Sequence, residues 1–462
     1  MLQLLAPEHR VTLLTPAPRA GRPQLPPLPA GTVVATYRAA GRGGERTSVG
    51  ERLGAASDLS GSAGERLGAA GERLGAASDL LGAASDLLGA AGDLLGAAGG
   101  LARAAVHGLP LQSGLFFSAD LRRQLRLLAP RADLVVLQLV RLAAHRADLG
   151  RTPVLIDLID DLALNFSRRA AIDRWWLRPA LALEARLLAR AQCRLARSAA
   201  GVLLVCDRDR RELTAHLAAA LAGRVWTAGL AVETSGGPPS PSPAAGSAAS
   251  ASGLAPGTAF ASPLAPGAAF AGPPLPGAAA FAGPPRLVFT GNLGYFVNAD
   301  AISWWLREVW PALAARRPDL EVVVAGDRPR PGLRRALAAA GSVTVVESPP
   351  DLPALLAGAA AALAPMRCGS GLPIKILEAW SRGVPVVASP WAAAGTTGVS
   401  GEDLLVAGSP RQWLEAMDRL LDDPAEGRRL AANGRRRLQA DYSRRQVKQQ
   451  LLAAVEAAVS GR

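Results

Sequence analysis

The segment 365–389 reads Pro-Met-Arg-Cys-Gly-Ser-Gly-Leu-Pro-Ile-Lys-Ile-Leu-Glu-Ala-Trp-Ser-Arg-Gly-Val-Pro-Val-Val-Ala-Ser, and it decides the fold. An apolar run precedes the Gly-Ser-Gly loop, Pro373 suits the first turn of a helix, and Gly383 suits the residue that follows its end. In this order, strand, glycine loop and helix start direct backbone N–H groups and the positive end of the helix dipole at one point. The segment therefore predicts an anion-binding site on a parallel strand–helix unit.

Lys375 and Glu378 stand three residues apart near the start of the predicted helix, so they project from the same side. A cation suits a diphosphate, and a carboxylate one turn further suits the hydroxyls of a ribose. The pattern favours a nucleotide-diphosphate sugar over ATP, whose binding loop places its lysine directly after the glycines. The alternative is a solvated surface pair on an ordinary strand–helix unit.

Short β-branched runs alternate with longer amphipathic segments along the rest of the chain, among them a long predicted helix at 170–198. This alternation predicts parallel sheets covered by helices, arranged as two Rossmann-like domains facing each other across a cleft. Ligands of such folds bind at the carboxyl ends of the strands. The predicted strands are 10–15, 31–37, 133–138, 153–158 and 201–206 in the first half, and 286–290, 320–325, 342–346, 359–364 and 384–389 in the second.

Two low-complexity tracts divide the chain. A seven-residue repeat fills 41–100, and a glycine in nearly every unit disfavours a coiled coil. Proline and glycine dominate 233–285, which we interpret as an interdomain linker. The expected organisation is an acceptor-side domain at 1–232 with the repeat inserted, the linker, a nucleotide-sugar-binding domain at 286–440, and a C-terminal helix at 441–462 that could cross back to the first domain.

The composition excludes several classes of protein. The 462 residues carry a net charge of +13, but the basic residues are arginines except for Lys375 and Lys448. Cys193, Cys206 and Cys368 are isolated, which argues against a disulfide framework or a cysteine-based metal site and fits a reducing compartment. No apolar run reaches the length of a membrane span. We expect a cytoplasmic protein, with attachment to the inner face of the membrane as an option, and no specific nucleic-acid partner.

The segment 369–389 resembles the donor-site signature of the GT-B retaining glycosyltransferases of family four: glycine loop, helix carrying a glutamate, then Gly-x-Pro-Val-Val-Ala-Ser. The resemblance implies retaining transfer of a sugar from a nucleotide-diphosphate sugar to a glycan or lipid-linked acceptor. It implies no metal and no cofactor besides the donor substrate. Further segments that look similar to this family are 289–292, 324–327, 347–356, 401–406 and 422–424.

The resemblance also assigns roles to residues. Glu378 would hold the ribose hydroxyls, and glycines would let the backbone approach the diphosphate or the sugar. Ser370 stands where the family often has a glutamate that contacts the donor sugar, and the loop 292–298 lacks the family's usual cations. Neutralisation of the diphosphate would then fall to Lys375, Arg367 or the helix dipole. The expected donor-binding residues are Gly291, Asn292, Gly326, Arg367, Gly369, Ser370, Gly371, Lys375 and Glu378.

Three aspartates stand at the carboxyl end of the predicted strand 153–158 or just after it: Asp157, Asp160 and Asp161. One of them could contact sugar hydroxyls or the acceptor proton, and we name Asp160 as a catalytic candidate beside Lys375 and Glu378. The alternative for Asp160 and Asp161 is an N-cap of the next helix. In a retaining enzyme of this type the leaving diphosphate can take the acceptor proton, so no nucleophilic carboxylate pair is assigned.

Other interpretations stay open. Residues 168–211 contain eleven arginines and four acidic residues, which suits an anionic membrane surface, although a solvated basic face is the alternative. Residues 1–5 look like the helix after the family's first strand and loop, so we expect either that the start of the chain is misassigned or that this strand is missing. The chain could thus be a non-catalytic nucleotide- or glycan-binding relative with an incomplete N-terminal domain, a basic membrane-surface interaction protein, or a sugar-nucleotide epimerase.

Overall fold

The computed structural model describes residues 11–16, 32–37, 108–232, 284–329, 331–349 and 351–461, and single positions at 99, 102, 104 and 106. The predicted helix at residues 1–5, the repeat tract up to residue 98 and the linker up to residue 283 lie outside this part of the chain. Within the described residues, no helix combines the length and the apolar character needed to cross a membrane.

The N-terminal domain is built on a parallel four-stranded sheet of order β3-β4-β5-β6. A separate parallel pair, β1 and β2, precedes it in the chain. The sequence predicted five of these six strands within one or two residues and missed the short β6. The strand bounds are β1 Val11–Pro16, β2 Thr32–Tyr37, β3 Val135–Gln138, β4 Val154–Ile159, β5 Gly201–Leu204 and β6 Val225–Thr227.

One prediction for this domain is wrong: 170–198 is not a single helix. The chain forms α5, turns at Asp173, and starts α6 with Pro179 in its first turn. Asp173 leaves the helical conformation, and proline fixes the dihedral angle that starts a helix but cannot donate a backbone hydrogen bond. The helices of the domain are α3 Leu111–Leu115, α4 Ala119–Leu128, α5 Leu162–Ile172, α6 Arg178–Ser198, α7 Asp207–Thr214 and α8 Ala219–Ala222.

The C-terminal domain has a parallel six-stranded sheet of order β12-β11-β10-β7-β8-β9. Its strands match the predicted positions, apart from the two-residue β12, which the sequence did not reveal. The strands are β7 Arg286–Thr290, β8 Glu321–Ala325, β9 Val343–Val346, β10 Ala361–Ala364, β11 Val386–Ala388 and β12 Leu405–Val406. The helices are α9 Phe296–Glu308, α10 Trp310–Arg316, α11 Pro331–Ala339, α12 Leu352–Leu356, α13 Ile374–Ser381, α14 Pro390–Ala393, α15 Pro410–Asp422 and α16 Pro424–Asp441.

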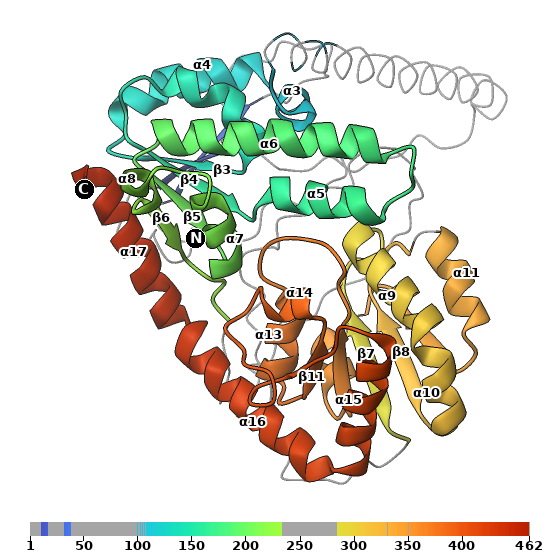
Figure 1. The fold of residues 1–462 in the computed structure, drawn as a ribbon. Helices are drawn as coiled ribbons and strands as arrows, with labels where there is room; N and C mark the ends of the chain where they lie inside the picture. The colour runs from blue at the N-terminus through green and yellow to red at the C-terminus, as the bar shows by residue number, and fades with distance from the viewer. Residues whose placement is uncertain are drawn as a thin grey trace, which may run out of the picture.

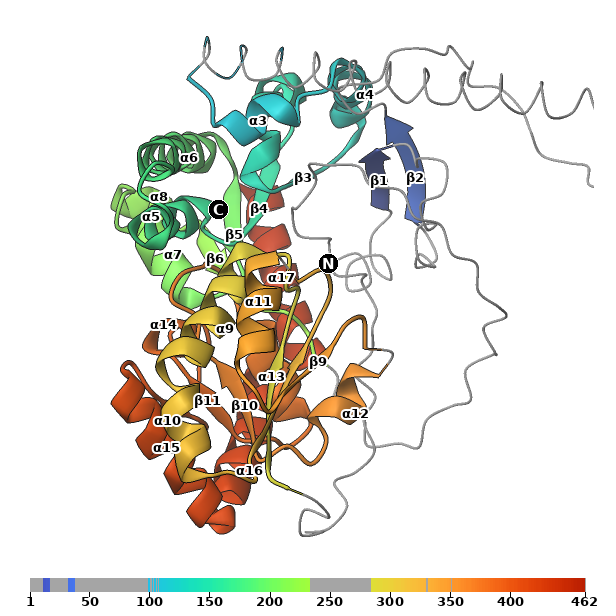
Figure 2. The same cartoon turned by 90° about the vertical axis from the view of Figure 1, so that its right-hand side faces the viewer.

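The strand order of this sheet positions the ligand site. From β7 the chain proceeds outward to β8 and β9, then returns to place β10 on the other side of β7. The connections after β7 and β10 therefore diverge, and the carboxyl ends of these two strands border the crevice that binds ligands in open parallel sheets. Figure 2 shows the N-terminal domain stacked on the C-terminal domain.

The last helix, α17 (Arg444–Ser460), connects the two domains (Figure 1). It follows α16 along the side of the molecule and packs Val447, Leu451 and Val455 against Leu155 of β4 and Leu203 of β5. Ahead of it, the backbone N–H of Val232 donates to the carbonyl of Tyr442 at 2.9 Å. The chain end thus joins the sheet of the first domain to the helical layer of the second.

Candidate active site

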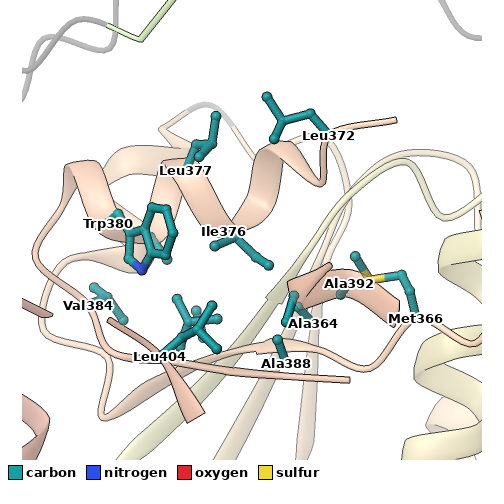
Figure 3. Close-up of a cluster of buried hydrophobic side chains, with 14 of the residues drawn as sticks. Ala364, Met366, Leu372, Ile376, Leu377, Trp380, Val384, Ala388, Ala392 and Leu404 are labelled. Carbon is teal, nitrogen blue, oxygen red and sulfur yellow. The ribbon is translucent and has the colours of Figure 1, made fainter. Parts of the chain in front are cut away.

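The helix α13 is held in place by one buried face. Ile376, Leu377 and Trp380 are fully buried in the cluster drawn in Figure 3. The indole Nε1 of Trp380 donates to the carbonyl of Asp403 at 3.1 Å. Because these three residues fix the rotation of the helix, the remaining side, which carries Lys375 and Glu378, faces β7 and α9.

Lys375 and Glu378 meet the carboxyl end of β7. The Lys375 ammonium donates to Oδ1 of Asn298 on α9 at 2.8 Å and lies 3.9 Å from the ring centroid of Phe289. The Thr290 hydroxyl donates to the Glu378 carboxylate at 3.4 Å. Both charged side chains are partly buried. The predicted pair is therefore not a solvated surface pair.

Loss of solvation shifts both charges of this pair. It lowers the pKa of Lys375 to about 7, against the opposing effect of the Glu378 charge. It raises the pKa of Glu378, against the opposing effects of Lys375 and of the hydrogen bond from Thr290. An anion bound beside Lys375 would favour its charged form and raise this pKa.

The loops after β7 and β8 need their glycines for packing. Gly291 and Gly326 have φ of 146° and 155°. A Cβ on Gly326 would lie 1.7 Å from the carbonyl oxygen of Gly291, and one on Gly291 would lie 2.9 Å from Nδ2 of Asn298. Asn292 closes the turn, since its Oδ1 accepts from the Gly294 N–H at 2.9 Å. The close approach of the two loops therefore accounts for both glycines without any ligand.

The Gly-Ser-Gly loop contacts the N-terminal domain. Gly369 and Gly371 have φ of 112° and 74°, as a left-handed loop requires. The Ser370 hydroxyl donates to Oδ2 of Asp160 at 2.7 Å, and the Gly371 N–H donates to Oδ2 of Asp209 at 2.7 Å. The expectation that the loop directs free N–H groups at a ligand is thus wrong for Gly371, because a carboxylate already occupies that donor.

Arg208 and Asp209 are the main site residues that the sequence did not single out. Asp209 is fully buried and also accepts from the Asp161 N–H at 2.9 Å. Arg208 pairs with Asp209 at 2.8 Å and donates to the carbonyls of Gly371 at 3.0 Å and Trp391 at 2.9 Å. Both residues follow β5, at the same sheet edge as Asp160. A charged residue directly after a predicted strand is the signal that marks Asp160, and it also applies to these two residues. In the sequence they stand within the arginine-rich segment 168–211, which hides the signal.

The aspartates at the end of β4 have different environments: Asp157 lies within the strand, and Asp160 and Asp161 follow it. Asp161 is the N-cap of α5, where it accepts from the Leu164 N–H at 3.0 Å. Asp157 is buried and accepts from the Gln138 amide at 3.3 Å. Asp160 faces the glycine loop, and burial raises the pKa of its carboxyl to about 6, opposed by the hydrogen bond from Ser370. Asp160 therefore stays a catalytic candidate, and the capping alternative applies to Asp161.

Arg367 is engaged by a carboxylate. Its guanidinium forms two hydrogen bonds with Asp300 on α9, at 2.9 and 2.6 Å. The charge that was predicted to neutralise a diphosphate is thus largely compensated.

Two helix starts at the site lack side-chain caps. α13 begins after Pro373 and α9 after Tyr295, and neither of these residues caps its helix. In the same domain, α14, α15 and α16 begin with capping Ser389, Ser409 and Asp423. The helices that follow the central strands β10 and β7 therefore retain first-turn N–H groups that an anion can accept from. Among the described residues, no group of three His, Cys, Asp or Glu side chains is placed to hold a metal ion.

Solved structures share this architecture. Sucrose-phosphate synthase from Thermosynechococcus elongatus superposes with a TM-score of 0.52 at 16% identity, covering 75% of this chain and 82% of that one. HepE of Anabaena, in complex with UDP and glucose, superposes with a TM-score of 0.50 at 15% identity. The superposition covers 73% of this chain and 81% of HepE. The fold is that of the GT-B glycosyltransferases.

Sequence comparisons agree with this fold. Residues 284–423 match the family described as glycosyl transferases group 1. An uncharacterized 44.6 kDa protein in the cps region of Klebsiella pneumoniae is 28% identical over 130 residues, which are 26% of this chain. The match spans one third of the length of that relative. The matched family segment contains the glycine loops, Lys375 and Glu378, whereas Asp160 and Asp209 lie outside it.

Proposed function

We propose that this GT-B protein transfers a sugar from a nucleotide-diphosphate sugar to a glycan or lipid-linked acceptor. The observation that carries the proposal is the position of Lys375 and Glu378, which face the carboxyl end of β7 beside two uncapped helix starts. The diphosphate would lie between the starts of α9 and α13 with Lys375 beside it, and the ribose hydroxyls would donate to Glu378. These groups would stabilise the charge that develops on the leaving diphosphate.

The comparisons support a uridine nucleotide as the first donor to test. HepE of Anabaena was crystallised in complex with UDP and with UDP-glucose. Its relation to this chain is one of fold, so the base and the sugar are part of the proposal. The relative in the cps region supports a role in polysaccharide synthesis.

Membership of family four and retention of anomeric configuration belong to the same proposal. No side-chain nucleophile is required, because the leaving diphosphate can accept the acceptor proton. Asp160, with a pKa near 6 and next to Ser370, would orient the donor sugar or the acceptor hydroxyl. Ser370 is shorter than the glutamate that the family often has at this position. Asp160, which lies across the domain contact from Ser370, would then select the donor sugar. The nucleotide sugar is a substrate, and the predictions of no metal, no separate cofactor and a reducing compartment remain proposals.

Calorimetric titration with UDP, UDP-glucose, GDP-mannose and dTDP-glucose tests the proposal. Glu378→Ala removes a charge-assisted acceptor of about 1.5–3 kcal/mol, so the affinity for the preferred donor should fall by about 10- to 150-fold. Glu415→Ala is the matched control, since Glu415 is exposed on α15 and pairs with Arg411. Unchanged donor affinity in Glu378→Ala would refute the assignment of the site. Retention is tested separately, by NMR of the anomeric configuration of the product.

A further inference from the structure

The turn between α5 and α6 exposes two neighbouring tryptophans. Trp175 is 74% exposed and Trp176 is 53% exposed, with their rings edge to face at 5.9 Å. Every residue from 174 to 180 is exposed, and Leu183 adds a 54% exposed side chain one turn into α6. Large apolar side chains gathered in this way on a surface indicate contact with a partner or a membrane.

Positive charge flanks these tryptophans along the chain, and the two acidic residues of the described segment 173–198 are both buried. Arg174 lies over the Trp176 ring at 5.3 Å from its centroid. Asp173 is buried and paired with Arg169. From residue 174 to residue 190 the acidic residue is Glu184, which is buried and accepts from the backbone of Leu111 at 2.8 Å. The surface is therefore aromatic and basic.

The exposed face of α6 continues this surface. Its outward positions recur every three or four residues, while Leu181, Leu188 and Leu195 face the core. The 21 residues of α6 extend for about 30 Å. The exposed positions of α6 after Ala180 are Leu183, Arg186, Arg190, Arg194, Arg197 and Ser198.

We propose that this surface, the 174–178 turn with the arginine stripe of α6, docks on an anionic phospholipid bilayer. Tryptophan rings sit at the headgroup level, where one part of the ring is apolar and the indole N–H is hydrated. Arginines attract anionic headgroups, and α6 presents its exposed arginines along one side while its apolar side packs in the protein core. The exposed arginines from Arg186 to Arg197 span about 17 Å along α6, and among the described residues 174–198 no exposed carboxylate interrupts them. This row complements a uniformly negative plane.

The surface lies next to the candidate active site. On α5, the Asn165 amide donates to the hydroxyl of Tyr295 at 2.8 Å, and Arg169 lies 4.4 Å from the ring centroid of Phe296. α5 thus runs from the start of α9 to the exposed turn, as Figure 1 shows. Docking through this turn would bring the cleft to the bilayer. The idea that the acceptor is lipid-linked rests on the proposed function. Docking of the surface on a bilayer is independent of that function.

Flotation of the full chain with phosphatidylcholine vesicles, with and without phosphatidylglycerol, tests the proposal. We expect binding that needs phosphatidylglycerol and weakens with salt. The double variant Trp175→Ala/Trp176→Ala should lower the partition coefficient by about tenfold or more. Arg186→Ala and Arg190→Ala should each lower it about fivefold. Leu127→Ala, which removes a 62% exposed side chain from α4, is the control and should bind as the wild type does.

Defined results would overturn the proposal. Vesicle binding that is unchanged in the double tryptophan variant, or that is equal on neutral vesicles, contradicts docking through this surface. Self-association that the tryptophan variant abolishes, without vesicle binding by the wild type, would assign the surface to a second copy of the chain instead. Thermal unfolding shows whether each variant is folded, and calorimetry with UDP is the independent readout. A variant that binds its nucleotide normally but no longer floats supports docking. A wild type that floats but binds none of UDP, UDP-glucose, GDP-mannose and dTDP-glucose refutes only the proposed function.

Discussion

Binding of the donor should be accompanied by uptake of a proton at Lys375. Loss of solvation lowers the pKa of this lysine to about 7. A diphosphate beside the ammonium would stabilise the charged form and raise that pKa. If the pKa in the complex exceeds 8 by a wide margin, binding takes up about a tenth of a proton at pH 6, about half at pH 7 and about nine tenths at pH 8.

Calorimetric titration with UDP in buffers of different ionisation enthalpy measures the number of protons taken up on binding. The same linkage predicts that affinity decreases above pH 7, by up to about tenfold for each pH unit, because the free protein must then gain a proton to bind. Lys375→Met should abolish the pH-dependent uptake. Lys448→Met replaces the chain's other lysine, which lies on α17, and should leave the proton uptake unchanged.

Two results would refute the reasoning. Proton uptake that stays the same between pH 6 and pH 8 would mean that the ammonium does not meet the diphosphate. Uptake that persists in Lys375→Met would assign the proton to another group, for instance Glu378, whose pKa is raised by loss of solvation.

Three further predictions concern stability, measured by urea unfolding. Because the pKa of Lys375 is lowered in the folded protein, the unfolded chain binds more protons than the folded one between pH 7 and about 10.5. The free energy of unfolding should therefore rise with pH in this window, by up to about 1.4 kcal/mol per pH unit. Lys375→Met should remove this rise. Asp209→Ala leaves Arg208 as an unpaired buried charge and should cost about 3–5 kcal/mol; a cost below about 1 kcal/mol would contradict the buried pairing. Gly434→Ala places a Cβ 2.3 Å from Trp380 and should cost about 1–3 kcal/mol, whereas Gly332→Ala, with open space around it on α11, should be neutral or stabilising by up to about 1 kcal/mol.

The fold was predictable where one local pattern determines it. The βα unit around α13 was predicted closely because Pro373 and Gly383 mark its two ends, and the helix occupies Ile374–Ser381. The break between α5 and α6 was missed because 174–178 contains residues that a helix accepts, and Pro179 alone indicates a new start. β12 has two residues, too few for a period-two pattern to be visible.

The candidate site was predictable on one side of the cleft only. Lys375 and Glu378 lie on one helix, so their spacing reveals that they share a face. The contacts of the glycine loop join residues 210 positions apart, Asp160 and Ser370, and 162 positions apart, Asp209 and Gly371. No periodicity links such distant positions, because their meeting depends on how the two domains pack.

The position of Asp209 changes how an anion can use the glycine loop. Its carboxylate accepts the N–H of Gly371, so a diphosphate can take that donor only if the two domains separate there. Arg208 compensates the charge of Asp209, which keeps the contact from repelling an anion bound nearby. The starts of α9 and α13, next to Lys375, lack side-chain caps and keep first-turn N–H groups for an anion. The diphosphate is therefore expected on the β7 side of the loop, and the domain contact at Gly371 would hold the loop in shape while the donor binds.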